Sequence, residues 1–312
     1  MVHGKIVLIT GATGFIGSCL AHRLVKRNYN IHIIKREYSN IWRIKDIIYR
    51  ITTHNVDLVD TINLEKVVKD IKPNIILHMA TYGGYPFQKN IRKIIGSNIF
   101  GTINLVNACS KVGFDIFINT GSSSEYGLKS KPMVETDLLE PISDYAVAKA
   151  SATLFCQAKA RREGLPIATL RLFSPYGYYE EPTRLIPSVI KSCLEGRNPK
   201  VSSSSYVRDF IFIKDVVNAY MKAIKTPHIG GQIFNIGYGL QHSLGDVLTK
   251  IIKLTRSKVK PEWGSSPKRP NEPSMWQADI TKATNILNWK PRYSLEEGLK
   301  KTINWYENKR KD

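Results

Sequence analysis

The sequence predicts an α/β protein built on a doubly wound parallel sheet, with a smaller α/β domain in its C-terminal part. Three observations support this prediction. Short apolar runs alternate with helix-like stretches through the first 175 residues, as they do when helices connect parallel strands. A glycine-rich turn follows the first apolar run. After residue 175 the pattern loosens, with many prolines and a serine run at 202–205.

The apolar runs are short and nearly continuous, which is typical of strands buried on both faces of a sheet. They are KIVLIT (5–10), NIHIIK (30–35), NIILHMA (74–80), DIFINT (115–120) and IATLRLF (167–173). Helices are expected between them at residues 16–27, 64–71, 98–112 and 145–163. This alternation defines a first domain over residues 1–175.

The C-terminal part is expected to be discontinuous. RDFIFIKDVVNAY and GQIFNIG, within about 208–236, are predicted to return as strands to the first domain. The remainder of 176–312 is expected to form a smaller domain that caps the sheet. No internal repeat is visible.

The composition is ordinary for a soluble protein, with 42% hydrophobic and 23% charged residues. No run approaches the roughly 18 apolar residues that span a bilayer, and no cleavable signal pattern precedes the first strand. The cysteines, at positions 19, 109, 156 and 193, are far apart. We therefore expect a cytoplasmic protein with reduced, mostly buried thiols, without a metal site and without a membrane partner.

The net charge of +20 favours an anionic ligand. The basic residues are spread along the chain, with a small concentration at 308–312, and they lack the aromatic interleaving of a nucleic-acid module. We therefore do not expect nucleic acid as a partner.

The first strand leads into LITGATGFIG, which places Gly11, Gly14 and Gly17 at the turn into the first helix, with Phe15 and Ile16 among them. A dinucleotide pyrophosphate needs bare backbone at such a turn, and a helix N-terminus offers free N–H groups and a positive dipole end. The strand, turn and helix context therefore predicts a dinucleotide site at these five residues.

The end of the second strand indicates which dinucleotide is bound. NAD-binding chains commonly carry a carboxylate there for the ribose hydroxyls. This chain has Lys35 and Arg36, which could pair with the 2′-phosphate of NADP. NADP is therefore predicted over NAD, although a solvated basic turn would have the same sequence and NAD stays possible.

Tyr145 and Lys149 lie four residues apart in YAVAK, so they share one face of the predicted helix. An ammonium beside a phenol is expected to bring its pKa toward working pH, which suits a general acid or base. Ser122 follows the strand at 115–120, at the sheet edge where ligands of open α/β folds bind. The Tyr and Lys spacing is common by itself, so Ser122, Tyr145 and Lys149 are candidates for one catalytic site.

The glycine triplet, HMAT, SSSEYG, YAVAK, RLFSPYG and RDFIFIKDV occur in order across nearly the whole chain. In this it resembles an extended short-chain dehydrogenase/reductase of the NAD(P)-dependent nucleotide-sugar epimerase/dehydratase family. The resemblance implies a Rossmann-like fold, a nucleotide-diphosphate sugar as substrate and a homodimer. It also implies that Tyr145 is the acid/base, that Ser122 hydrogen-bonds the reacting oxygen, and that Lys149 also holds the nicotinamide ribose.

Further site residues follow from the same resemblance. Asp57 and Leu58 would border the adenine, and Ala80 and Asn98 the cofactor pocket. The nicotinamide would lie near Phe173, Ser174 and Pro175. The candidates for substrate binding are Ser123, Ser124, Arg184, Arg208 and Arg269.

The resemblance implies chemistry at C4 of a nucleotide-linked hexose. An NADP-dependent oxidoreductase acting on a 4-keto-6-deoxy sugar is expected first, and a 4-epimerase resembling UDP-glucose 4-epimerase is the alternative. A 4,6-dehydratase is disfavoured, because the acidic residue of dehydratases lies two positions before the motif tyrosine, where this chain has Ser124. Glu125, one residue later, is given a structural role. A non-catalytic nucleotide- or nucleic-acid-binding relative is disfavoured because the predicted catalytic residues are all present.

Overall fold

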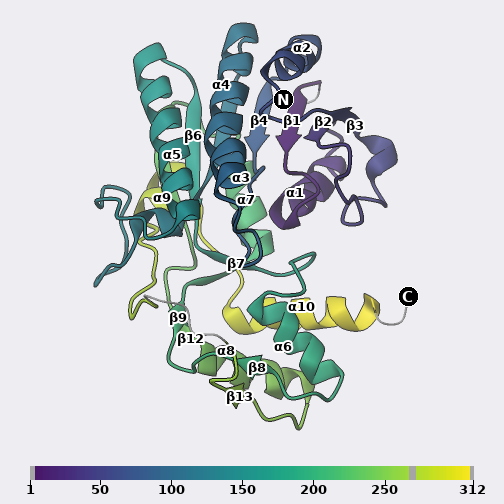
Figure 1. Ribbon diagram of the computed structural model, residues 1–312, viewed down its shortest axis with the longest axis vertical. Helices are drawn as coiled ribbons and strands as arrows, with labels where there is room; N and C mark the ends of the chain where they lie inside the picture. Colours follow the sequence, from purple (N-terminus) through teal and green to yellow (C-terminus); the bar gives the residue numbers. More distant parts are fainter. Residues whose placement is uncertain (1–3, 267–271, 310–312) are drawn as a thin grey trace.

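The computed structural model describes residues 4–266 and 272–309. Within these residues, seven parallel strands form one sheet in the order β11-β6-β5-β4-β1-β2-β3 (Figure 1). The chain winds outward from β1 in both directions, which confirms the predicted fold class. The strands are β1 (Ile6–Thr10), β2 (Asn30–Lys35), β3 (Thr52–Asn55), β4 (Ile75–His78), β5 (Ile116–Ser122), β6 (Ile167–Leu172) and β11 (Ile233–Ile236).

Helices cover both faces of this sheet because its central strands are buried on both sides. One apolar core lies between the sheet and helices α2, α4 and α5, and a larger core includes α1 and α7. A short helix α3 and a π-helical turn at 96–100 lead into α4. The bounds are α1 (Phe15–Val25), α2 (Thr61–Ile71), α3 (Ile91–Ile95), α4 (Gly101–Val112), α5 (Asp144–Glu163) and α7 (Ile213–Ala223).

The ends of helix α5 are fixed by local sequence. The Ser143 hydroxyl accepts a hydrogen bond from the Ala146 amide at 3.2 Å, which caps the helix N-terminus. The helix ends at Gly164, which has the left-handed φ of +66° that glycine adopts without strain. These caps set where the helix carrying Tyr145 and Lys149 begins and ends.

The C-terminal part gathers below the sheet (Figure 1). There α6 (Leu185–Leu194), α8 (Leu244–Thr255) and α10 (Leu295–Lys309) pack together, while α9 (Thr281–Leu287) lies against β11. Pairs of short strands connect this part: β7 (Ser174–Tyr176) with β10 (Phe210–Phe212), β9 (Val207–Arg208) with β12 (His242–Ser243), and β8 (Lys200–Val201) with β13 (Glu262–Trp263).

The structure differs from the sequence prediction at 208–220. This segment does not add a strand to the main sheet: it forms two short strands and then helix α7, which packs on α1. Its apolar residues fit a buried helix as well as a strand, so their run does not distinguish the two. The other returning segment does pair, with β11 beside β6. The domain boundary at 175 stays a prediction.

The buried carboxylate of Asp209 joins three distant parts of the chain. It accepts backbone hydrogen bonds from Tyr238 at 2.6 Å, Gly239 at 3.0 Å and Ala278 at 2.9 Å. Its own carbonyl accepts from the amide of Ser174 at 2.9 Å. Through its side chain and its backbone carbonyl, Asp209 therefore holds together the segments that follow β6, β9 and β11 and precede α9.

The thiols of Cys109, Cys156 and Cys193 are buried and that of Cys19 is half-buried, and all four are free, which agrees with the expectation of reduced cysteines. Within 4–266 and 272–309, no helix is both long and apolar enough to cross a bilayer.

Candidate active site

The glycine-rich turn between β1 and α1 is shaped for a close approach by a ligand. Gly11 has a φ of +73°, and a Cβ atom on it would lie 2.6 Å from the backbone nitrogen of Ala80. A Cβ on Gly17 would overlap the Gly11 carbonyl oxygen. Larger residues at these positions would push the turn away from β4, so the turn keeps its shape only with glycine.

The N-terminus of α1 is open to an anion. Gly14 is its N-cap, makes no side-chain capping bond, and is followed by no acidic residue in the first turn. Phe15 is buried under the helix and Ile16 is half-buried. Free amides at the positive end of a helix fit a pyrophosphate, so the residues present suit the predicted dinucleotide.

The two predicted cations, Lys35 and Arg36, lie at the C-terminal end of β2. Arg36 is exposed, and the half-buried Lys35 donates only a long hydrogen bond of 3.4 Å to the carbonyl of Glu37. Beyond the neighbouring strand β3, Asp57 is exposed and Leu58 is buried. Both cations have the freedom to turn toward a phosphate beside β2.

The loop after β4 is held by Asn98. The buried amide of Asn98 accepts from the Thr81 hydroxyl at 2.8 Å and from the Tyr82 amide at 3.1 Å, and donates to the Tyr82 carbonyl at 2.6 Å. Ala80 donates its amide to the hydroxyl of Thr10 at 3.3 Å. Asn98 therefore shapes the wall of the predicted cofactor pocket by fixing this loop, from within a π-helical turn.

The serine turn follows β5 directly. The Ser122 hydroxyl accepts from the amide of Ser124 at 3.2 Å and shares a hydrogen bond of 2.8 Å with the Ser124 hydroxyl. Ser123 is buried and Ser124 is half-buried. The turn thus holds the Ser122 hydroxyl at the carboxyl edge of the sheet.

The structure brings Tyr145 to Ser122 and Thr81. Burial raises the pKa of the Tyr145 phenol, hydrogen bonds with the Thr81 and Ser122 side chains and the charge of Arg184 lower it, and Glu125 raises it. The lowering by Lys149 that the sequence predicted is therefore wrong in this state: the loop after β4 covers the phenol, and desolvation dominates. The ring lies 3.3 Å from the position of a Cβ built on Gly83 in that loop.

Lys149 is buried, with 4% of its surface exposed. Burial lowers the pKa of its ammonium, while the nearby Glu125 and Cys156 raise it. Burial, and to a lesser extent the charge of Lys149, lowers the pKa of His78 to about 3. His78 is therefore neutral, and it bonds the hydroxyls of Thr10 and Thr102.

Arg184 lies on the other side of the candidate site. Its guanidinium carbon is 5.2 Å from the centroid of the Tyr85 ring, and its charge lowers the pKa of Tyr145 and of the buried Glu180. One carboxylate oxygen of Glu180 lacks a hydrogen-bond partner within the described chain. Arg184 is thus a cation close to the predicted acid/base.

Some of the predicted site residues are already engaged elsewhere or lie outside the described residues. Arg208 forms an ion pair of 2.6 Å with Glu272 and lies over the Trp276 ring, so its charge is already compensated. Phe173 is buried against Tyr126, while Ser174 and Pro175 begin the short strand β7. Arg269 lies outside the described residues.

Sequence reasoning missed two residues that line the same region. Thr81 lies just beyond the end of β4 and Ser122 is the last residue of β5, so the rule that strand ends meet at one edge could have found Thr81. Arg43 donates to the carbonyls of Tyr179 at 2.6 Å and Thr13 at 3.4 Å, and pairs with Glu181 at 3.3 Å. No local pattern marks Arg43, because these partners lie 30 to 138 residues away.

The open sheet, the glycine turn and the hydroxyl cluster at one edge are those of dinucleotide-binding oxidoreductases. The profile of the NAD dependent epimerase/dehydratase family matches residues 7–237. The chain therefore belongs to this family, as the motifs predicted, and is an enzyme of the extended short-chain dehydrogenase/reductase type that uses a nicotinamide dinucleotide.

Individual relatives span almost the whole chain. A UDP-glucuronate 4-epimerase of Thermodesulfobacterium geofontis is 28% identical, over 96% of this chain and 95% of its own length. UDP-glucose 4-epimerase of Thermotoga maritima, solved with UDP-glucose, superposes with a TM-score of 0.90 at 25% identity, covering 98% and 99% of the two chains. dTDP-glucose 4,6-dehydratase of Bacillus anthracis, solved with NAD, gives 0.88 at 25% identity, covering 99% and 98%.

Proposed function

We propose that this enzyme moves a hydride at C4 of a nucleotide-linked hexose, as an NADP-dependent reductase of a 4-keto-6-deoxy sugar. The observation that carries the proposal is the cluster of the Ser122, Thr81 and Tyr145 hydroxyls at the carboxyl edge of the sheet. Relatives that cover nearly all of this chain are 4-epimerases and a 4,6-dehydratase of nucleotide sugars, which supports chemistry at the same carbon.

The chain's own residues would bind the dinucleotide from one end to the other. The turn at Gly11, Gly14 and Gly17 would hold the pyrophosphate, and Lys35 and Arg36 the 2′-phosphate of NADP. When bound, the nicotinamide supplies the hydride. Lys149 would hold the nicotinamide ribose, and 173–175 would line the far side of the ring.

Tyr145 would donate a proton to the 4-keto oxygen while Ser122 donates a hydrogen bond to it. The raised pKa of Tyr145 supports the reductive direction, because a protonated phenol is the form needed to give a proton away. Arg184 would attract the diphosphate of the substrate toward Tyr145. Ser123, Ser124, Arg208 and Arg269 are further candidates for substrate contacts.

A 4-epimerase is the second candidate, and the 4-epimerases described above favour it. Both activities use Tyr145, so nicotinamide absorbance during turnover separates them. A reductase consumes one NADPH for each sugar reduced, whereas an epimerase interconverts two sugars with no net absorbance change. The dehydratase is less well supported, because Glu125 is buried in an ion pair with Arg171 and is not free to move protons.

We also propose a homodimer that pairs through helices α4 and α5. Apolar side chains are exposed on and near these helices: Phe100 is 54%, Val147 is 48% and Leu154 is 52% exposed. Burying such side chains between two copies would remove them from water. The proposal extends to a cytoplasmic location and to a boundary near residue 175 between the cofactor and substrate domains.

Two experiments test the proposed function. Mass spectrometry of the small molecules released on denaturation would identify a bound dinucleotide or nucleotide sugar. Kinetic comparison of Ser122→Ala with Ser124→Ala tests which of the two serines donates a hydrogen bond to the reacting oxygen. Ser122→Ala should lower turnover about 10- to 1,000-fold, because it removes one such donor. A larger loss with Ser124→Ala would reject Ser122, and no turnover of any nucleotide sugar by the wild type would reject the function.

A further inference from the structure

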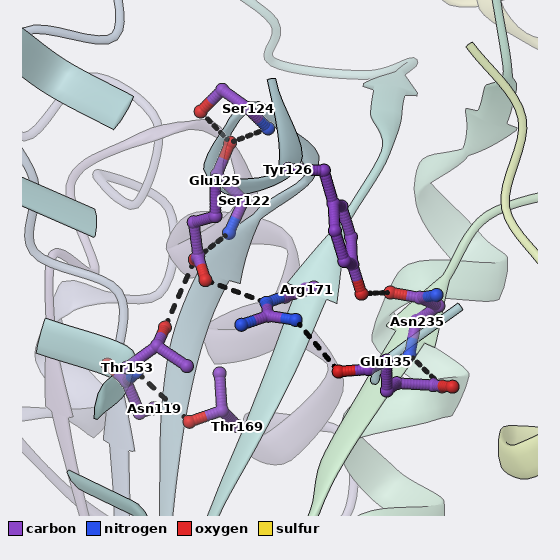
Figure 2. Close-up of polar contacts among 10 residues, drawn as sticks. All are labelled: Asn119, Ser122, Ser124, Glu125, Tyr126, Glu135, Thr153, Thr169, Arg171 and Asn235. Atoms are coloured by element: carbon purple, nitrogen blue, oxygen red, sulfur yellow. Dashed lines mark hydrogen bonds and ion pairs between the residues drawn. The ribbon is translucent and has the colours of Figure 1, made fainter. Parts of the chain in front are cut away.

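A buried ion pair lies directly beside the serine turn. The Glu125 carboxylate oxygen Oε2 is 2.7 Å from Arg171 Nε, and the two side chains are 0% and 1% exposed (Figure 2). Charges so far from water are stable only when every hydrogen-bonding group around them is satisfied. The partners of this pair therefore show what it holds in place.

The Glu125 carboxylate connects three elements of the candidate site. Its Oε1 accepts from the backbone amide of Ser122 at 2.7 Å and from the Thr153 hydroxyl at 3.1 Å. Thr153 lies one helical turn after Lys149 on α5, and Arg171 lies on β6. A single carboxylate thus joins the serine turn, the helix of the predicted acid/base and the neighbouring strand (Figure 2).

Arg171 continues the network away from the site. Its guanidinium lies over the Tyr126 ring, 4.7 Å from the centroid, and donates to the Glu135 carbonyl at 3.5 Å. The Tyr126 hydroxyl donates to Asn235 Oδ1 at 2.7 Å, and the Asn235 amide donates to the Glu135 carboxylate at 2.8 Å. The network of contacts that holds Glu125 in place therefore extends to β11.

Glu125 and Arg171 both pack closely against the backbone of Gly121. A Cβ built on Gly121 would lie 2.8 Å from Glu125 Oε1 and 2.9 Å from the Cγ of Arg171. The carboxylate thus packs directly against the end of β5, and only glycine at 121 admits it.

Glu125 is also a charge near both ionisable catalytic candidates. It raises the pKa of the Tyr145 phenol and supports the charged form of Lys149. Other titratable groups face the same residues. Arg184 acts with Glu125 on Tyr145, and Cys156 acts with Glu125 on Lys149, which in turn acts on His78. Tyr126 acts with Glu125 on Arg171.

We propose that Glu125 is a positioning residue of the active site, which locks Ser122 and helix α5 into one rigid unit and places one fixed negative charge beside Tyr145 and Lys149. The proposal rests on the proposed function for the roles of those residues. The sequence assigned Glu125 a structural role, and its contacts extend that role to the chemistry. Two apolar side chains could fill the same volume without a desolvation cost. We therefore explain the buried charge of Glu125 by its hydrogen bonds to Ser122 and Thr153 and by its effect on Tyr145 and Lys149.

The test separates the charge of Glu125 from its hydrogen bonds. Glu125→Gln removes the charge with little change of shape, while Thr153→Val removes one hydrogen bond and keeps the charge. The ionisation of Tyr145 is followed by tyrosinate absorbance, as the difference between each protein and the same protein carrying Tyr145→Phe. This titration uses no substrate, so it decides the proposal even where no nucleotide sugar is turned over.

In Glu125→Gln we expect a lower pKa of Tyr145 than in the wild type, because a nearby negative charge no longer opposes ionisation. The pH at which reductase activity declines should fall by the same amount, with kcat reduced about tenfold or more and KM little changed. Thr153→Val should lower kcat but leave the pKa of Tyr145 in place.

An unchanged Tyr145 pKa in a folded Glu125→Gln protein would overturn the proposal, as would an equal shift in Thr153→Val. Circular dichroism reports folding. Should Glu125→Gln not fold, the double variant Glu125→Gln with Arg171→Met removes both charges, and a fall in the pKa of Tyr145 is again expected, because Glu125 is among the charges that act on Tyr145 and Arg171 is not. If the wild-type protein turns over no nucleotide sugar, the proposed function is rejected, but this titration of Tyr145 still tests the role of Glu125.

Discussion

We expect the wild-type protein to lose folding stability at alkaline pH because of Glu180, and we expect Glu180→Gln to remove that loss. Glu180 is buried, one of its carboxylate oxygens lacks a hydrogen-bond partner within the described chain, and burial raises its pKa from 4.5 to about 8. The charge of Arg184 and a backbone hydrogen bond from Gly177 oppose this rise, and the charge of Glu181 adds to it. The protonated carboxyl is therefore the form that the folded protein prefers.

The sign and size follow from linkage. A raised pKa means that the folded protein holds the proton more tightly than the unfolded chain, so the contribution to stability is fully present below about pH 4.5 and is lost as the pH rises through about 8. At about 1.4 kcal/mol for each pKa unit, the loss between about pH 6 and pH 9 is roughly 2–3 kcal/mol. Entry of water around the ionised carboxylate makes this an upper value.

Urea unfolding of the cofactor-free protein, at a fixed protein concentration and at both pH values, measures this loss. Other titrating groups are common to wild type and variant and cancel in the difference between them. Glu37→Gln, at an exposed site, is the matched control and should keep the wild-type dependence on pH. If Glu180→Gln also kept that dependence, the buried carboxyl would not be its source and the reasoning would be refuted.

Four further predictions concern the site and the assembly. Tyr145→Phe should lower turnover by about 10²- to 10⁴-fold while cofactor affinity, measured by fluorescence titration, is retained; full turnover would exclude Tyr145 as the acid. Wild-type protein should bind NADP more tightly than NAD in calorimetry, by up to ~1.5–3 kcal/mol for each well-formed contact of Lys35 and Arg36, with the preference weakening as salt rises, and Lys35→Asp with Arg36→Ala should invert it. Equal affinities in the wild type would mean that the two cations do not reach the 2′-phosphate. Leu154→Glu should convert a dimer into a monomer by light scattering, and a wild type that is already monomeric contradicts the pairing. Arg171→Met should lower the free energy of unfolding by about 3–5 kcal/mol, because it leaves Glu125 buried without a counter-charge; an unchanged urea midpoint would show that the pair contributes little.

Features set by local sequence were predictable. The turn at Gly11 follows from the need for bare backbone between a strand and a helix, and YAVAK places Tyr145 and Lys149 on one helical face by spacing alone. The strands were found because buried parallel strands are continuous apolar runs. The edge strand β3 was missed because its residues, Thr52–Asn55, are polar and mostly exposed.

Features set by contacts between distant residues were not predictable. The sequence predicts Arg208 as a substrate-binding cation, but in the fold Arg208 pairs with Glu272, which lies 64 residues away in the sequence. The pKa of Tyr145 was expected to fall because Lys149 is near in sequence, yet the loop at 81–84 covers the phenol and burial has the larger effect. Charge partners and desolvation depend on the whole fold, which no local pattern contains.

The three hydrogen bonds of Asp209 bear on how the chain folds as it is made. Ala278, which supplies one of them, lies 69 residues later, so at about 5–20 residues per second the ribosome needs roughly 3 to 14 s to deliver it. During that interval the nascent carboxylate keeps its water, because burying it with incomplete partners would be unfavourable. The segment around Asp209 must therefore stay open until Ala278 has been made, and the contacts that join these parts of the chain form late in synthesis.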